Sequence, residues 1–155
     1  MKTNLKLDMK TLYDQDFYQW INSTVKQIRE RNFSEVDWEN LLEELESLGK
    51  QQQQELENRL IVLFEHLLKY AYWLSEKEYN ERGWKGTIRE QRQQIKRLLK
   101  KNPSLKPYLL QVWAECYQDA REITLDKTGL SADIIPEQVF INQAEILDEN
   151  FLPEL

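Results

Sequence analysis

One stretch of this chain, residues 38–74, constrains the fold more than any other because it combines a helical repeat with almost no helix breakers. It contains no proline and one glycine, Gly49. On a helical wheel, at about 100° per residue, eight later positions lie within roughly 60° of Leu41. These positions are Leu45, Leu48, Gln52, Leu56, Leu63, His66, Tyr70 and Leu74. The stripe keeps its phase across Gly49, so the sequence predicts one long helix, which the glycine weakens by only about 1 kcal/mol relative to alanine.

Two signals mark the start of this helix. Ser34 followed by Asp37 is an acidic variant of the capping box, and Phe33 with Trp38 has the spacing of a hydrophobic staple. Shorter helices are predicted on either side, over residues 14–31, 87–101, 104–128 and 142–147. The first is expected to start at Asp14 or Asp16, the third helix has an alternative start near Trp84, and residues 75–86 are predicted to be a break because they are polar and contain two glycines.

These elements predict an all-α fold, in which four main helices form a bundle around the long second helix and a short helix follows at the C-terminal end. We expect a single domain over residues 13–155 and a flexible tail over residues 1–12. A length of 155 residues, 41% of them hydrophobic and 31% charged, is typical of one globular domain and argues against disorder.

Several classes of protein are disfavoured by the composition. No apolar run approaches the roughly 20 residues of a membrane span, and the first ten residues lack the apolar region of a secretory signal. A single cysteine, Cys116, excludes an internal disulfide and a cysteine zinc cluster. We therefore expect a cytoplasmic protein with no membrane partner and no cofactor.

The net charge of −6 is unevenly distributed. Residues 35–57 are strongly acidic, whereas residues 82–101 are strongly basic. Two explanations stay open: acidic and basic helices that neutralise one another, or a basic surface that binds phosphates.

Six segments carry a resemblance to a known family. They are YDQDFYQW (13–20), ENLLEELESLG (39–49), LENRLIVLFEHLLKY (56–70), WKGTIREQRQQI (84–95), PSLKPYL (103–109) and YQDAREI (117–123). With their order and spacing, the chain resembles the family called domain of unknown function 29, small bacterial proteins found mostly in cyanobacteria. The resemblance covers nearly all of residues 12–153 and implies a compact all-helical fold. It implies no activity, so no catalytic residue is assigned.

Polar residues interrupt the apolar stripes. Glu55, Arg59 and His66 lie on the stripe of the long helix, and Arg92 lies on that of the third helix. Either these four form a polar layer that fixes the register of the helices, or they line a pocket that binds a small ligand or performs acid–base chemistry. We expect Arg92 to be mostly buried and paired with Glu55, because a guanidinium keeps its charge and needs acceptors.

A metal site is not expected. His66 is the only histidine, and Leu63 stands where a Glu-x-x-His motif needs a glutamate. Cys116 lies on the apolar face of its helix and is expected to be a buried, unreactive thiol.

A nucleic-acid surface is the alternative use of the third helix. Its candidate residues are Trp84, Lys85, Arg89, Arg92 and Lys96, which combine an aromatic ring with a basic helical face.

The leading hypothesis is a non-catalytic helical module that binds another protein or a second copy of itself. The long helix exceeds its neighbours in length, so part of it is expected to project from the fold or to be covered by a partner chain. Any of the five tryptophans left exposed would mark that interface. Nucleic-acid binding, and an enzyme or small-ligand site in the polar pocket, are the alternatives.

Overall fold

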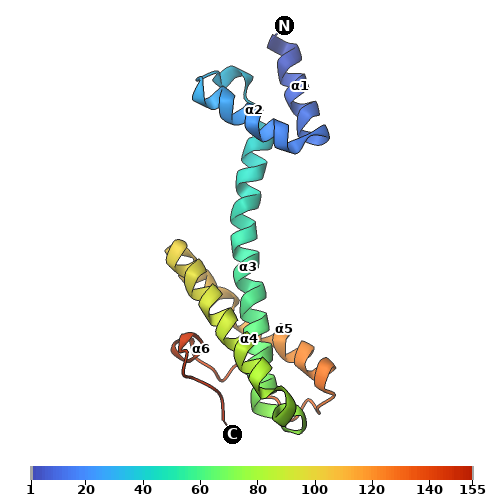
Figure 1. Ribbon diagram of the computed structural model, residues 1–155, viewed down its shortest axis with the longest axis vertical. Coiled ribbons are helices and arrows are strands. Elements are labelled where there is room, and N and C mark those ends of the chain that lie inside the picture. The colour runs from blue at the N-terminus through green and yellow to red at the C-terminus, as the bar shows by residue number, and fades with distance from the viewer. Residues whose placement is uncertain (1, 155) are drawn as a thin grey trace. The chain divides into compact units, whose positions relative to one another are not determined.

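The computed structural model describes residues 2–154, with side chains from residue 9 onward. This part of the chain forms α-helices and two short 3-10 helices and contains no strand. The α-helices are α1 (Lys2–Gln15), α2 (Phe17–Arg29), α3 (Trp38–Tyr72), α4 (Leu74–Lys101), α5 (Lys106–Thr128) and α6 (Gln143–Leu147) (Figure 1). The all-α class and the long helix, α3, are confirmed.

The chain divides into two compact units, Met1–Lys50 and Gln51–Leu155, and α3 contributes residues to both. That residues 13–155 behave as one domain stays a prediction.

The first unit contains α1, α2, the 3-10 helix η1 (Phe33–Glu35) and the start of α3. Residues 2–12, for which the sequence predicted a flexible tail, belong to α1, and their flexibility stays a prediction. Aromatic packing holds the end of α1 in place, since the ring of Tyr13 lies 5.0 Å from that of the buried Trp20. The sequence did not indicate this helix, because Leu5, Leu7 and Met9 alternate along the chain instead of recurring every three or four residues.

Side-chain caps set the helix boundaries in this unit. Asp16 accepts a hydrogen bond from the backbone N–H of Gln19 and starts α2, as predicted. At α3 the cap is Asp37, not Ser34, because the Asp37 carboxylate accepts bonds from the N–H and the side chain of Asn40. Residues 33–35 form the separate helix η1 instead.

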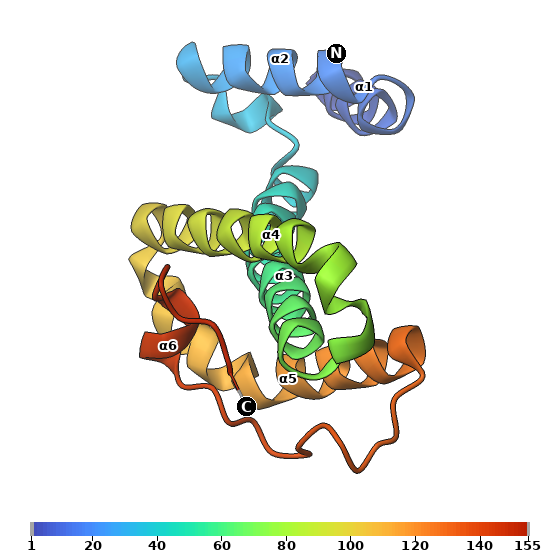
Figure 2. The same cartoon turned by 60° about the horizontal axis from the view of Figure 1, so that its bottom comes forward.

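The second unit is built around the C-terminal half of α3. Leucines on several sides of this half are fully buried, namely Leu56, Leu60, Leu63, Leu67 and Leu68. A helix that is apolar on most sides must be covered on most sides. The cover comes from α4 and α5, which lie across this half of α3 (Figures 1 and 2) and contribute the buried Ile88, Ile95, Leu109 and Tyr117.

The break predicted over residues 75–86 is wrong, because α4 already begins at Leu74. Gly83 and Gly86 are tolerated inside the helix at about 1 kcal/mol each. Burial offsets that cost: Trp84 is only 7% exposed and stacks on Trp73, with the ring centroids 5.8 Å apart.

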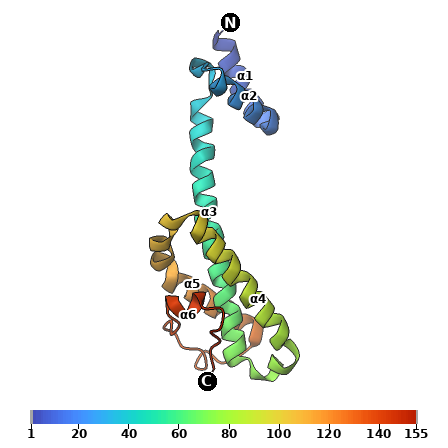
Figure 3. The same cartoon turned by 60° about the vertical axis from the view of Figure 1, so that its left-hand side comes forward.

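Two buried arginines hold the chain that follows α5. Arg121 donates to the carbonyl oxygens of Ile135 (3.0 Å) and Ala132 (2.8 Å). Arg92 donates to those of Ile146 (2.7 Å) and Glu145 (3.3 Å), in the helix α6 that lies beside α5 (Figure 3). Each guanidinium thereby satisfies one buried carbonyl, that of Ile146 or of Ile135, which would otherwise lack a partner.

The end of α5 and the start of α6 are as predicted. Gly129 adopts a left-handed conformation with φ 69° and ends α5, and its N–H bonds to the carbonyl of Leu125. Asn142 and Glu145 form a reciprocal capping box at α6. Among the described residues, no helix has the length and apolar character needed to cross a bilayer.

Candidate functional site

The most unusual surface of the first unit is an apolar face on α3, which we call the leucine face. It consists of Trp38, Leu41, Leu45 and Leu48, spaced three or four residues apart, together with Leu42 next to Leu41. Leu42, Leu45 and Leu48 are 57%, 56% and 54% exposed. The same helix therefore has a covered apolar stripe in one unit and an uncovered one in the other.

Trp38 begins this face and is 43% exposed. Its indole N–H donates to the carbonyl of Phe33 at 2.9 Å, and the two rings lie 6.4 Å apart. Trp20 and Trp84, in contrast, are buried. An exposed tryptophan at one end of an apolar face is typical of a protein interface.

The charged residues along the leucine face are all acidic. Residues 38–48 contain Glu39, Glu43, Glu44 and Glu46 and no lysine or arginine. Two of these contact α1: Lys10 forms an ion pair with Glu39 at 3.0 Å, and the Tyr13 hydroxyl donates to Glu44. That bond raises the pKa of Tyr13 to about 12. Glu46 is exposed beside the face and has no ion pair in the described structure, whereas the exposed Glu43 lies on the opposite side of the helix.

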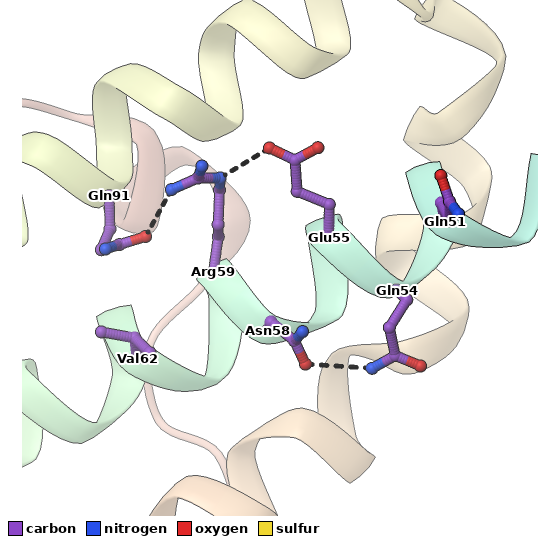
Figure 4. A pocket seen from close by; sticks show the side chains of 7 residues that line it. All are labelled: Gln51, Gln54, Glu55, Asn58, Arg59, Val62 and Gln91. Atoms are coloured by element: carbon purple, nitrogen blue, oxygen red, sulfur yellow. Dashed lines mark hydrogen bonds and ion pairs between the residues drawn. The ribbon is translucent and has the colours of Figure 1, made fainter. Parts of the chain in front are cut away.

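The second unit has a polar pocket of about 410 Å³. Its lining residues are mostly amides: Gln51, Gln54, Glu55, Asn58, Arg59, Val62 and Gln91 (Figure 4). The Arg59 guanidinium lies between two partners, donating to Glu55 at 3.0 Å and to Gln91 at 3.3 Å. Gln54 donates to Asn58 at 3.0 Å. Because Glu55 already neutralises Arg59, the pocket offers hydrogen bonds rather than a net positive charge.

Of the four polar-stripe candidates, the structure brings only Glu55 and Arg59 together at this pocket. Arg92 is 1% exposed and bound to backbone carbonyls, so the predicted pairing of Arg92 with Glu55 is wrong, although its predicted burial is confirmed. Sequence spacing placed Arg92 in the helix seam correctly. It gave no information on the C-terminal chain, which supplies the acceptors.

His66 is half-buried and belongs to a different cluster. Its Nδ1 lies 2.8 Å from the carbonyl of Val62 and 3.3 Å from the Glu65 carboxylate. Burial lowers the pKa of His66, and the neighbouring Lys69 lowers it further, against the opposing effects of Val62 and Glu65.

Glu65 is the centre of this cluster and was missed by sequence reasoning. Its carboxylate is buried and binds Lys127 at 2.8 Å and Lys69 at 3.4 Å. Burial alone would raise the pKa of Glu65, but the bond from Lys127 and the charge of Lys69 outweigh it and hold the pKa low. Lys69 at i+4 was a sequence signal for part of this network, whereas Lys127 on α5 was not.

The nucleic-acid candidates on α4 have different environments. Lys85, Arg89 and Lys96 are exposed, whereas Trp84 and Arg92 are buried and offer no surface to a base or phosphate. Lys85 pairs with Glu81 at 2.9 Å, and Lys96 with Glu149 at 3.5 Å. The exposed basic residues of α4 without such a pair in the described structure are Arg82, Arg89, Arg97, Lys100 and Lys101.

Cys116 is buried on α5, and its nearest polar partner is the carbonyl of Glu57 at 3.9 Å. Burial and the Glu57 charge raise the pKa of Cys116 to about 12, which leaves the thiol protonated at neutral pH. The described residues contain no cluster of three or more His, Cys, Asp or Glu side chains that could hold a metal ion.

Comparison with known proteins identifies one family for this chain. The family model described as Domain of unknown function DUF29 matches residues 12–152. No curated protein and no solved structure matches the chain.

Proposed function

Because this chain belongs to the DUF29 family, whose description assigns no activity, we propose a function from its own surface: a non-catalytic helical module that binds another protein chain. The leucine face is the binding surface.

One observation carries this proposal: the exposure of Leu42, Leu45 and Leu48 on successive turns of one helix. Full burial of a leucine side chain contributes about 1.5–3 kcal/mol, so each half-exposed leucine forgoes a sizeable part of that. Contiguous apolar surface on a folded protein is unfavourable in water and is typical of binding sites. A partner helix laid along the face would recover the lost contribution.

The test is affinity capture from the native host together with light scattering over a range of protein concentrations. The test variant is Leu45→Gln/Leu48→Gln. The matched control is Leu74→Gln/Leu110→Gln, which changes two leucines of similar exposure in the second unit. We expect the wild type and the control to bind a partner chain, and the test variant to lose at least tenfold in affinity. Equal binding by all three, or a strict monomer that captures nothing, would refute the proposal.

Nucleic-acid binding is the second candidate, supported by the exposed basic residues of α4 that have no acidic partner. The partners of Lys85 and Lys96 weaken this candidate, as does the net charge of −6. Binding through several phosphate contacts would show a log–log salt slope of about −0.9 per contact on duplex DNA. The absence of any shift of DNA or RNA at about 50 mM salt, a concentration at which such contacts are strong, would exclude it.

A further inference from the structure

An apolar groove of about 540 Å³ lies within the second unit, between the end of α4, the start of α5 and the short helix α6. It shares no lining residue with the polar pocket around Arg59. Pockets that hold small molecules have volumes of roughly 300–1,000 Å³ and are mostly apolar. The lining of this groove is mostly aliphatic and comes from all three helices: Leu99, Pro107, Leu109, Leu110, Ala144 and Leu147.

Part of this aliphatic lining is exposed to solvent. Leu110 is 56% exposed, whereas its neighbour Leu109 is 3% exposed and belongs to the core. Pro107, one turn before Leu110, is exposed as well. Exposed apolar surface within a groove is typical of a binding site. An alkyl chain in the groove would cover both of these side chains.

Two lysines at the groove have charges that the protein leaves unpaired. Lys106 lines the groove itself and is exposed. Lys96 contacts Glu149, just after α6, at 3.5 Å. Lys100 follows Lys96 by one turn, so it lies on the same side of α4, toward α6. Neither Lys100 nor Lys106 has an acidic partner in the part of the chain that the structure describes.

The acidic side chains at this end of the unit are already engaged. Glu149 pairs with Lys96. The carboxylates of Glu145 and Asp148 each accept a hydrogen bond from a backbone N–H, at 3.2 and 2.9 Å. The two unpaired lysines are therefore free to bind an anion at the edge of the groove.

We propose that this groove binds a medium-chain fatty acid: the alkyl chain lies against α5 and α6, and the carboxylate binds Lys100 and Lys106. Hydrogen bonds between two charged groups are stronger than those between neutral groups. None of the described residues that line the groove has an aromatic ring. It therefore offers a planar ligand nothing to stack on and lacks the aromatic residues in which protein interfaces are enriched. A flexible alkyl chain fits such a lining.

The experiment is calorimetric titration of the full chain with decanoate, decanol and decyltrimethylammonium, each below the concentration at which it forms micelles. The three probes have similar alkyl chains and differ in the charge of the head group. We expect decanoate to bind one molecule per chain, at least tenfold more tightly than either of the others, because only its head group is complementary to the lysines. The backbone amide signals of Lys106, Leu110 and Ala144 should shift in NMR spectra on binding.

The test variant is Lys100→Glu/Lys106→Glu, and it is expected to bind decanoate at least tenfold more weakly. The matched control is Arg97→Glu/Lys101→Glu, which changes the net charge by the same amount. Both control positions are exposed and lie about 160° from Leu99 around α4. The control should bind like the wild type. Leu110→Gln, at an exposed position, should weaken binding at least threefold, and circular dichroism checks that each variant is folded.

Four results would overturn the inference. They are no binding of decanoate up to about 1 mM, a concentration that corresponds to a very weak complex, equal binding of decanol and decanoate, and equal weakening by the two charge variants. The fourth is binding of an acidic, leucine-rich peptide in the groove without binding of decanoate, which would assign the groove to a protein partner.

The proposed function is judged separately, because the leucine face is a different surface. Leu45→Gln/Leu48→Gln should bind decanoate like the wild type and lose its partner chain. If this variant loses decanoate instead, the fatty acid binds at the leucine face, and the assignment of the groove is wrong.

Discussion

The two halves of α3 have the same apolar periodicity and opposite surroundings. In the second unit, Leu56, Leu60 and Leu63 are fully buried beneath α4 and α5. In the first unit, Leu42, Leu45 and Leu48 are each more than half exposed. Part of the difference lies in the helix itself, because its second half is apolar on several sides and the leucine face is confined to one. The rest comes from whether other helices provide a complementary apolar surface.

The largest effect on stability is expected when the same substitution, leucine to alanine, is made in each half of α3. Leu60→Ala should lower the free energy of unfolding by about 2–5 kcal/mol, because it opens a cavity in a closed core. Leu45→Ala should cost about 0.5 kcal/mol or less in the monomer, as for other exposed positions. Denaturant unfolding at low protein concentration measures both. Equal losses would mean that the leucine face is already covered within one chain, and the comparison would fail.

The second prediction concerns the way in which the second unit is closed. Arg92→Met removes the donors to the carbonyls of Ile146 and Glu145 and should cost about 2–4 kcal/mol, since it leaves buried acceptors without partners. Arg89→Met is the matched control on the exposed side of the same helix, and it should change little. Adding Glu55→Leu to Arg92→Met should recover nothing, because Glu55 pairs with Arg59. Recovery in the double variant would show that Glu55 does partner Arg92.

The third prediction is a pH dependence located in the second unit. The pKa of His66 is lowered in the folded protein, first by burial, below the unfolded value of about 6.5. Between these two values the unfolded chain binds a proton that the folded chain does not, so stability falls as pH decreases through this window. Above about pH 6.5 both states are neutral at this site and no dependence arises from it.

Urea unfolding between about pH 8 and pH 5 measures this slope, across the range in which histidine titrates. The substitution His66→Asn should flatten it, even if the variant is less stable at every pH. An unchanged slope would assign the pH dependence to groups other than His66. Glu65 cannot produce this slope, because its lowered pKa causes stability to be lost only at lower pH, as the carboxylate protonates.

The last prediction concerns the exposure of a thiol, which a labelling experiment compares between the two units. Cys116, with its pKa raised to about 12, should not react with a thiol reagent at about pH 8 until the protein unfolds. The variant Cys116→Ala/Leu48→Cys moves the single thiol to the leucine face and should react at once. Slow reaction at position 48 in dilute protein would contradict the exposure of that face.

The positions of the helices could be predicted where the signal is local. Capping at Asp16, the glycine stop at Gly129 and the box between Asn142 and Glu145 all depend on residues within one turn of the helix end. The false break at residues 75–86 shows the limit of this reasoning. There, Lys77 and Glu81 occupy positions on the inner side of α4 at which an apolar residue is usual. Both contact Tyr70, and the Lys77 Nζ lies 3.9 Å from the centroid of the Tyr70 ring. Because this side of the helix is polar, its helical repeat was not recognised.

The candidate site was less predictable because it depends on contacts between distant segments. The pair of Glu55 and Arg59 is a local one, because a spacing of four residues places both side chains on the same side of the helix. The acceptors of Arg92 lie more than fifty residues further along the chain, and the pairing of Lys127 with Glu65 joins residues 62 positions apart. No periodicity within one helix contains that information.

The sequence by itself determined the helical class, the long α3 and the angular position of its apolar stripe, because hydrophobic spacing and helix caps act over a few residues. Only the tertiary structure decided which part of that stripe is covered. Burial depends on whether a second surface of matching shape and charge reaches it, and α4 and α5 do so for residues 56–68. The leucine face has the same spacing, but the part of the chain that the structure describes leaves it exposed to solvent.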